Sequence, residues 1–300
     1  MPSLRAWLMM ALIRATGMKD KARDTAKFPD RVRMIQARGP APPGKAREKR
    51  LLITRESFGG YGVFTVAPRD GASRHHILYL HGGAYVFDLL DVHWRAVEEL
   101  VRRTGATVTI PLYPLAPRHC WKDALGMVQP LHAALAARHG AENLIVAGDS
   151  AGGGMTLALA QLIRDAGERL PAGLVMFSPW LDVASDDPRL MALAARDPML
   201  APPAAQMAGR WYARDLPLDD PRVSPLYGSL EGLPPMILFT GTRDMLNADA
   251  HRLRDKAAAE AADLRFREYE DMFHVWVCLP IPEARQALAE AATFIIGGRS

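Results

Sequence analysis

The sequence predicts an α/β protein with a mostly parallel central sheet, helices on both faces and a helical insertion. Short apolar segments typical of buried strands alternate with segments of helical periodicity over residues 76–177 and 236–295. Such alternation is typical of βαβ units. With 300 residues, 49% of them hydrophobic, the chain is long enough to bury a large core. Residues 184–221 lack any strand pattern, so we expect them to form an insertion over the sheet.

The first apolar stretch, Leu4–Ile13, predicts a helix rather than an export signal, because Arg5 and Arg14 interrupt it and no small-residue cleavage site follows. We expect this helix to pack on the rest of the protein; peripheral contact with a membrane is the alternative. No run of 18 apolar residues occurs, which predicts no membrane span. The expected packed face consists of Trp7, Leu8, Leu12 and Ile13.

The alternating part of the chain begins with a hairpin, in which Gly59 and Gly60 separate the strand-like runs Leu51–Ser57 and Tyr61–Val66. Apolar runs then predict further strands at His76–Leu80, Ala106–Ile110, Asn143–Ala147, Leu174–Phe177, Met236–Thr240 and Leu264–Tyr269. Helical spacing predicts helices at Val92–Arg103, Trp121–Ala137, from Ala151 onward, Asp187–Ala195, Pro203–Ala213, Ala248–Ala261 and Glu283–Ile295.

Composition and charge exclude several classes of protein. The net charge is only +4 and Lys and Arg are interspersed with Asp and Glu, so we expect no nucleic-acid partner. The richest basic run, Lys45–Arg55, follows a proline-rich segment and is interpreted as a solvated connector. Cys120 and Cys278 are the only cysteines and form no metal-spaced pair. We therefore expect no metal site and a reducing, cytoplasmic location.

The segment around Ser150 carries the strongest chemical signal. An apolar strand pattern ends in Gly148-Asp149-Ser150-Ala151-Gly152, and a helical pattern follows. This arrangement predicts a nucleophile elbow, in which a strained strand-to-helix turn presents the serine hydroxyl above the sheet. Side chains at positions 148 and 152 would collide with neighbouring backbone in such a turn, which explains the two glycines.

A serine hydroxyl needs a histidine base that is itself oriented by a carboxylate. After an elbow of this kind, the acid and then the histidine follow in loops at the ends of later strands. His274 lies in such a loop, whereas His251 falls within a predicted helix. Asp244 follows the strand before the one that leads to His274, so we expect it to be the acid. Asp182 and Asp271 are the alternatives.

A tetrahedral intermediate also needs backbone N–H donors for its oxyanion. The turn His81-Gly82-Gly83-Ala84 follows a predicted strand and precedes a predicted helix. Its glycines leave the backbone open to a substrate. We therefore predict that the N–H groups of Gly82, Gly83 and Ala151 form the oxyanion hole.

Together these motifs resemble the hormone-sensitive-lipase-like esterases, also called bacterial family IV, of the α/β-hydrolase fold. The resemblance covers roughly residues 51–295 and includes the placement of Asp244 and His274. It rests on His-Gly-Gly-Ala-Tyr at 81–85, Tyr-Pro-Leu-Ala-Pro at 113–117, Gly-Asp-Ser-Ala-Gly-Gly at 148–153 and Ser-Pro-Trp-Leu-Asp at 178–182. The chain departs from the family at Pro114 and Arg118, where arginine and glutamate are usual, so the family's charge network around this loop is not carried over.

The resemblance implies a helical cap made of residues 1–48 and 184–221 over a catalytic domain made of residues 49–183 and 222–300. It implies a catalytic triad of Ser150, Asp244 and His274. The oxyanion donors would be Gly82, Gly83 and Ala151, and the residues that support these motifs would be His81, Gly148, Asp149 and Gly152.

We therefore expect a cofactor-free serine carboxylesterase that hydrolyses short- to medium-chain acyl esters through an acyl-enzyme intermediate. Lactone hydrolysis and deacetylation use the same groups and stay open as alternatives. A non-catalytic ligand receptor on the same scaffold is disfavoured, because all three residues of the triad are present. The expected partner is a small-molecule ester, and a homodimer is an open alternative for the oligomeric state.

Overall fold

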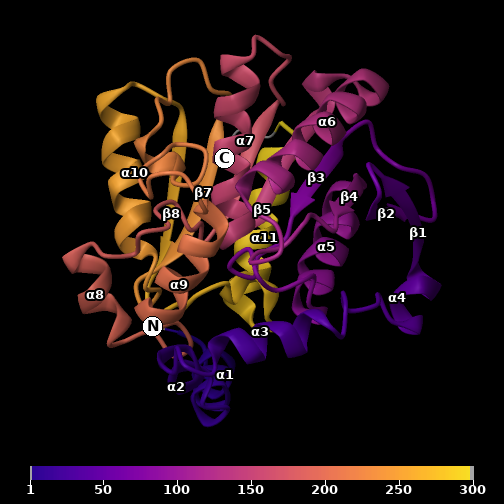
Figure 1. Cartoon of the computed structure of the whole chain (residues 1–300). Helices are drawn as coiled ribbons and strands as arrows, with labels where there is room; N and C mark the ends of the chain where they lie inside the picture. The colour runs from indigo at the N-terminus through magenta and orange to yellow at the C-terminus, as the bar shows by residue number, and fades with distance from the viewer. Residues whose placement is uncertain (1, 298–300) are drawn as a thin grey trace.

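An eight-stranded sheet crosses the centre of the molecule, in the order β1-β2-β4-β3-β5-β6-β7-β8 (Figure 1). The computed structural model describes residues 2–297. Strands β3 to β8 are parallel, and β1 and β2 form an antiparallel hairpin at one edge, which confirms the predicted mostly parallel sheet. The strands are β1 Leu51–Phe58, β2 Tyr61–Pro68, β3 His76–Leu80, β4 Thr107–Pro111, β5 Leu144–Asp149, β6 Gly173–Phe177, β7 Met236–Gly241 and β8 Leu264–Tyr269.

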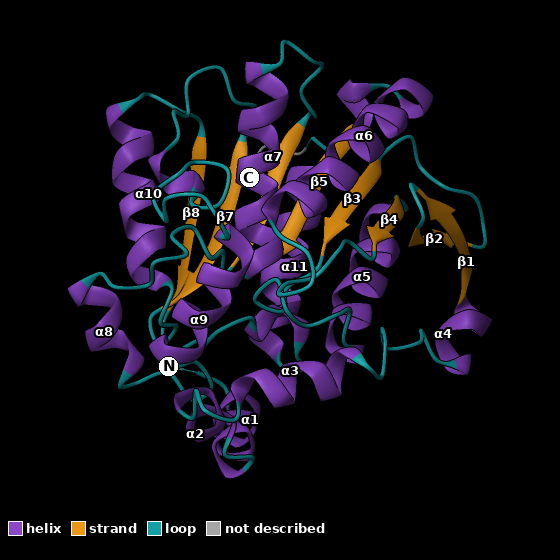
Figure 2. Cartoon of the chain, in the orientation of Figure 1, coloured by secondary structure: helices purple, strands orange, loops and turns teal. Residues whose placement is uncertain are grey.

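Helices cover both faces of this sheet (Figure 2). The core on one face is built with α5 and α11, and the core on the other face with α6, α7 and α10. The α-helices are α1 Leu4–Ala15, α2 Met18–Arg23, α3 Phe28–Gln36, α4 Lys45–Arg50, α5 Asp91–Thr104, α6 Trp121–His139, α7 Ala151–Asp165, α8 Pro188–Ala194, α9 Pro202–Ala213, α10 Asn247–Ala259 and α11 Pro282–Ile295.

The central strands are apolar along their whole length because both of their faces are covered. Every residue of β3, β5, β6 and β7 is buried. Successive side chains of β3 point to opposite faces, so Ile77 contributes to the core with α5 and Leu78 to the core with α7. At the edge of the sheet, β1 instead exposes Arg55 and Glu56. Charges on an edge strand discourage pairing with another chain.

The two segments predicted as a cap lie together beyond the carboxyl ends of the parallel strands (Figure 1). The rings of Phe28 on α3 and Trp211 on α9 stack at 5.6 Å. The Lys19 ammonium on α2 donates to the carbonyls of residues 194, 195 and 197, at 2.5, 3.0 and 2.7 Å. Met1 of the predicted cap and residues 298–300 of the predicted catalytic domain lie outside the described residues.

Helix α1 is attached to the last helix of the chain. The N–H and hydroxyl of Ser3 donate to the carboxylate of Glu283 at 2.5 and 3.0 Å. This attachment turns Ala6 and Met10 inward, where both are fully buried. No helix within residues 2–297 has the length and apolar character needed to cross a membrane.

The prediction of which face of α1 packs on the protein is therefore wrong. Trp7, Leu8 and Leu12 are 42%, 62% and 61% exposed, and only Ile13 of the expected set is half-buried. The sequence could not settle the rotation of α1, because apolar residues occur all round this helix.

The interpretation of Lys45–Arg55 as a solvated connector is also wrong. Residues 45–50 form α4, and β1 begins directly after it. Arg47 and Arg50 pair with the carboxylate of Glu98 on α5, at 3.3 and 2.7 Å. The basic run is ordered because an acidic partner from α5 lies beside it.

Two tyrosine rings join the insertion to the turn after β3. Tyr85, after β3, and Tyr212, on α9, stack with centroids 3.6 Å apart and planes within 5° of each other. Tyr85 also stacks on Trp180 at 5.6 Å. The hydroxyl of Tyr212 is buried and has no hydrogen-bond partner among the described residues. Burying a hydroxyl without a partner costs free energy.

We predict that Tyr212→Phe leaves the free energy of unfolding unchanged or raises it by up to about 1 kcal/mol, because it removes that hydroxyl and keeps the ring. Tyr212→Ala, which removes the stack, is expected to lose about 3–5 kcal/mol. Guanidinium unfolding curves of the three proteins measure both changes. A loss of more than about 1 kcal/mol in Tyr212→Phe would mean that the hydroxyl has a partner such as a bound water.

Candidate active site

Ser150 sits on a strained turn between β5 and α7. Its φ of 53° and ψ of −121° lie in a region that side-chain-bearing residues rarely occupy. Neighbouring backbone holds the turn: the Ser150 N–H donates to the carbonyl of Phe177 at 2.9 Å, and the Ser150 carbonyl accepts from the N–H of Trp180 at 2.8 Å. The turn therefore projects the serine hydroxyl away from the sheet.

The glycines on either side of this turn are required by close backbone contacts. A Cβ at Gly148 would lie 2.4 Å from the carbonyl oxygen of Gly152 and 2.7 Å from that of Leu80. A Cβ at Gly152 would lie 1.9 Å from the carbonyl oxygen of Leu80. Strand β3 passes so close to the turn that neither position has room for a side chain.

A continuous chain of hydrogen bonds joins Ser150, His274 and Asp244. The Ser150 Oγ lies 2.9 Å from His274 Nε2. His274 Nδ1 lies 3.1 and 3.0 Å from the two carboxylate oxygens of Asp244. All three side chains are buried: Ser150 is 8% exposed, His274 4% and Asp244 0%. Loops after β5, β7 and β8 bring these three distant residues to one point.

The surroundings of His274 favour its charged form. Burial by itself lowers the pKa of the imidazole, but the charge of Asp244, its hydrogen bond and the charge of Asp197 outweigh burial. The pKa of His274 is therefore raised above its ordinary value of 6.5. Because its pKa is raised, the neutral imidazole of His274 is a stronger base toward a hydroxyl proton.

The other acids and the other histidine considered from the sequence are engaged elsewhere. His251 on α10 contacts Glu268 at 2.5 Å. Asp182 accepts from Arg252 at 2.9 Å and from a tyrosine hydroxyl, and Asp271 pairs with Arg243 at 2.6 Å. None of these three residues has a hydrogen bond or ion pair with His274 among the described contacts.

One predicted oxyanion donor must be corrected. The N–H of Gly82 donates to the Asp149 carboxylate at 3.1 Å, so Gly82 is already occupied within the fold. No hydrogen bond within residues 2–297 uses the N–H groups of Gly83, Ala84 or Ala151. Gly83 has a φ of 120°, and a Cβ there would lie 2.5 Å from the carbonyl oxygen of Phe87. The open donors are therefore one residue further along the turn than the sequence suggested.

Asp149 fixes the turn after β3 through its buried carboxylate. Its carboxylate accepts from the Tyr79 hydroxyl at 2.8 Å and from Gly82, and it lies 3.4 Å from His93 Nε2. His93 Nδ1 accepts the N–H of Leu90, which leaves the ring proton on the nitrogen that faces Asp149. Burial favours the protonated acid, but the contact with His93 and these hydrogen bonds prevail and lower the pKa of Asp149. Sequence analysis did not find Tyr79 or His93, because their roles depend on tertiary contact.

His81, the first residue of the turn, acts as a buried support. Its Nδ1 lies 2.8 Å from the carbonyl oxygen of Gly82, and its ring stacks on Tyr113 at 4.4 Å. The Tyr113 hydroxyl donates to the His81 carbonyl at 2.6 Å. Burial lowers the pKa of His81 to about 4, so the ring is neutral at physiological pH. The contacts of His81 therefore fix the loop and leave the site without an additional charge.

Asp197, in the insertion, is a second buried carboxylate that the sequence did not reveal. One of its oxygens accepts the N–H groups of Met199 and Leu200, each at 2.8 Å. The other accepts the N–H of Met245, the residue after Asp244, at 2.9 Å. Burial and the nearby Asp244 raise the pKa of Asp197 to about 6. Asp197 thus ties the insertion directly to the loop that carries Asp244.

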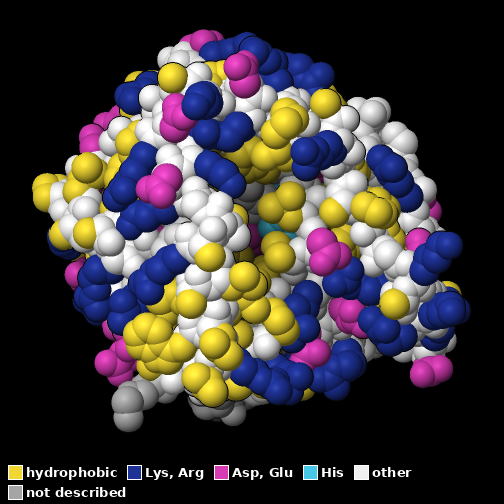
Figure 3. All heavy atoms as spheres, turned by 90° about the horizontal axis from the view of Figure 1, so that it is seen from below, with side chains coloured by type: hydrophobic (Ala, Val, Ile, Leu, Met, Phe, Trp, Pro, Cys, Tyr) yellow, Lys and Arg dark blue, Asp and Glu magenta, His cyan; other side chains and the backbone are white. Residues whose placement is uncertain are grey.

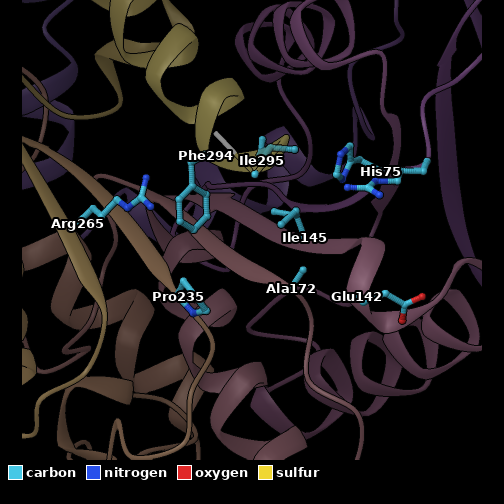
Figure 4. A pocket seen from close by; sticks show the side chains of 10 residues that line it. His75, Glu142, Ile145, Ala172, Pro235, Arg265, Phe294 and Ile295 are labelled. Carbon is cyan, nitrogen blue, oxygen red and sulfur yellow. The ribbon is translucent and has the colours of Figure 1, made fainter. Parts of the chain in front are cut away.

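A cavity away from this site has a different character (Figure 4). It has a volume of about 310 Å³ and is lined by residues such as His75, Glu142 and Ile145. These residues lie at the amino ends of the strands, whereas Ser150 follows the carboxyl end of β5. Among the described residues, its lining contains no serine or cysteine. Within residues 2–297, no cluster of three or more His, Cys, Asp or Glu could hold a metal ion.

Known proteins are similar to this chain in sequence and in fold. The family described as "alpha/beta hydrolase fold" matches residues 77–278. An acetyl-hydrolase of Streptomyces hygroscopicus is 32% identical over 273 residues, covering 84% of this chain and 90% of its own. An esterase of Acinetobacter venetianus is 34% identical over 226 residues, 73% of each chain. The crystal structure of a hormone-sensitive lipase from a metagenome library superposes with a TM-score of 0.86 at 28% identity, covering 97% of each chain.

We predict that the imidazole of His274 titrates above pH 6.5 and that Asp197→Asn lowers its pKa, because one of the negative charges that stabilise the imidazolium is removed. Asp244→Asn should lower the pKa further, since it also removes the carboxylate in contact with the ring. Asp271→Asn is the matched control. Asp271 lies in the loop after β8 that also carries His274, but it pairs with Arg243. Nitrogen NMR of the imidazole measures each value. A wild-type pKa below 6.5 would contradict this account.

Proposed function

Since the chain belongs to the hormone-sensitive-lipase-like esterases of the alpha/beta hydrolase fold, we propose that it hydrolyses carboxylic esters through an acyl-enzyme intermediate on Ser150. The observation that carries this proposal is the unbroken chain of hydrogen bonds from the Ser150 hydroxyl through His274 to Asp244. A serine hydroxyl in contact with an oriented imidazole is the arrangement from which a nucleophilic serine forms.

In the first half of the reaction, Ser150 Oγ attacks the carbonyl carbon of the ester while His274 Nε2 takes the hydroxyl proton. Asp244 keeps the imidazole in the tautomer whose Nε2 is free to accept, and stabilises the imidazolium that forms. The tetrahedral intermediate then collapses, the bond to the leaving alcohol breaks, and His274 returns the proton to the alkoxide. The acyl group is left on Ser150.

The oxyanion of the intermediate needs donors that are already aligned. The N–H groups of Gly83, Ala84 and Ala151 serve this role in our proposal, because they have no acceptor within the described chain and border the turn. Gly82 takes the supporting role instead, through its bond to Asp149. In the second half of the reaction, His274 removes a proton from water, which attacks the acyl group and releases the acid.

The position of the two segments predicted as a cap favours a substrate with an apolar acyl group of limited length. They lie over the carboxyl ends of the strands, where Ser150 is placed. Leu200, Met207 and Trp211 pack against the core there and are only half-buried. The face seen from this end is hollowed, and hydrophobic side chains surround the hollow (Figure 3). Such a lining favours apolar groups that fit and rejects those that exceed the roofed volume.

Removal of acetyl groups is a second candidate, favoured by one observation. The Streptomyces hygroscopicus relative is named an acetyl-hydrolase and covers 84% of this chain. The same triad and the same oxyanion donors would serve both activities, so the difference lies in how much room the acyl pocket offers.

We expect Ser150→Ala to fold normally and to lose on the order of 10⁶ in kcat on p-nitrophenyl butyrate, because the acylated oxygen is removed. His274→Ala should lose nearly as much, while His251→Ala keeps wild-type activity, since His251 contacts Glu268 instead. Near-ultraviolet circular dichroism confirms folding of each variant. A folded Ser150→Ala protein that retained more than about one per cent of the activity would exclude the acyl-enzyme mechanism.

Acyl-chain preference distinguishes the two candidates. We predict the highest kcat/KM for p-nitrophenyl esters of about four to eight carbons, with each accommodated methylene contributing up to about 1–3 kcal/mol. A sharp preference for the acetyl ester would favour acetyl removal instead. Trp211→Ala, which enlarges the roof, should move the optimum to longer chains. A flat profile from acetyl to palmitoyl esters in the wild-type enzyme would show that the helical segments do not shape the acyl pocket.

A further inference from the structure

Helix α1 turns its largest apolar side chains toward solvent. Leu4, Trp7, Leu8 and Leu12 are 75%, 42%, 62% and 61% exposed. At about 100° per residue, these four positions fall on one side of the helix, which we call the α1 face. The opposite side of α1 is buried on the protein. A helix that is apolar on both sides normally has both sides covered, so the α1 face lacks a partner in the isolated chain.

Positive charges border the α1 face. By the same helical spacing, the exposed Arg5 lies beside Leu12 and the exposed Arg14 lies beside Trp7. The guanidinium of Arg243 lies over the Trp7 ring at 5.4 Å. Residues 1–44 contain nine Lys and Arg and three Asp, a net charge of +6, whereas the remainder of the chain carries −2. The charge of the chain is therefore concentrated in the segment that carries the α1 face.

A basic cavity opens where α1 ends. Its volume is about 310 Å³, and the charged residues that line it are Arg14, Lys19, Asp20, Arg23, Arg196 and Asp197. Lys19 holds the wall together through its three carbonyl contacts, and Asp197 is occupied by backbone N–H groups. Asp20 pairs with Arg23 at 3.4 Å. Within residues 2–297, Arg14 and Arg196 have no carboxylate partner and remain available to an anion.

We propose that the α1 face docks on the surface of a bilayer that contains anionic lipids, with a head-group phosphate held between Arg14 and Arg196. Interfacial helices bury Leu and Trp at the boundary between head groups and acyl chains, while flanking Arg and Lys contact anionic head groups. Trp in particular is enriched at that boundary. The contact is peripheral, because only one side of α1 is available.

Charge favours a lipid surface over a second copy of the chain. Two copies facing each other through α1 would bring two segments of net charge +6 together, and like charges in apposition oppose association. An anionic bilayer offers the opposite charge next to an apolar layer. Seen from the α1 side, hydrophobic side chains gather beside numerous Lys and Arg, and the hollow opens on the same face (Figure 3). This proposal does not depend on the ester hydrolysis proposed above.

Sedimentation of the full chain with vesicles tests the proposal. One vesicle preparation contains only neutral phosphatidylcholine, and the other contains roughly a third of phosphatidylglycerol, which gives a negative surface potential. We expect binding to the anionic vesicles, weaker binding as salt is raised, and little binding to the neutral ones. Equal binding to both preparations, or binding to neither, would overturn the proposal.

Two double variants examine the two halves of the surface. Leu8→Ser with Leu12→Ser, and Arg14→Glu with Arg196→Glu, should each weaken vesicle binding by about tenfold or more, because they remove apolar burial or reverse charge at the head groups. All four side chains are exposed, so the melting temperature should change little.

Matched controls carry the same changes at exposed positions elsewhere. Leu52→Ser with Leu90→Ser, and Arg138→Glu with Arg169→Glu, should bind vesicles as the wild type does. Loss of binding in these controls equal to that of the double variants would mean that total charge or apolar area, and not the α1 face, drives binding. That result would overturn the proposal.

Two further measurements test the alternatives to a lipid surface, which are a free anion in the cavity and a second copy of the chain on the α1 face. If inorganic phosphate raises the melting temperature through Arg14 and Arg196 while vesicles do not bind, the cavity takes a free anion and the lipid proposal is wrong. If light scattering shows a dimer that Leu8→Ser with Leu12→Ser dissociates, and vesicles again do not bind, a second copy covers the α1 face and the proposal is equally wrong. Binding of anionic vesicles by a monomer supports the proposal.

Discussion

The strained backbone at Ser150 is the constraint on which the rest of the structure depends. A side-chain-bearing residue at this φ and ψ costs about 1–3 kcal/mol, and the surrounding structure must supply that free energy. It does so from neighbouring chain segments: the carbonyl of Phe177 at the end of β6 binds the Ser150 N–H, and Trp180 binds its carbonyl. Strand β5 must therefore lie inside the sheet, between β3 and β6. The glycines at 148 and 152 follow from the same crowding.

Two buried carboxylates extend this constraint outward. Asp149 joins the elbow to the turn after β3 and, through His93, to α5. Asp197 joins the insertion to the loop of Asp244. A buried carboxylate is costly unless its oxygens are hydrogen-bonded, and both of these are. Each carboxylate therefore holds in place the segments that meet around it. Asp149 fixes the turn after β3, and Asp197 fixes the loop that carries Asp244.

The sequence predicted those features that depend on neighbouring residues or on the order of elements along the chain. The elbow at Ser150 is a matter of neighbouring residues, and His274 and Asp244 were selected because each follows a late strand. Contacts between distant segments left no such pattern. Asp197 lies in the insertion without a motif, and His93 sits on an ordinary amphipathic helix, so nothing marked either residue as a neighbour of the site. Gly82 was assigned to the oxyanion because the direction of the Asp149 side chain cannot be derived from spacing. The outward face of α1 was missed for a related reason, since its rotation depends on a bond to Glu283, 280 positions away.

That bond between Ser3 and Glu283 has a consequence for the way the molecule is made. Helix α1 docks on α11, whose Glu283 lies 280 positions after Ser3, so the site that α1 occupies is complete only after α11 has been synthesised. Closure of such long-range contacts is slow, and apolar segments exposed in the meantime are prone to aggregate. The apolar, basic helix α1 therefore lacks its packing partner while the chain between the two helices is being made.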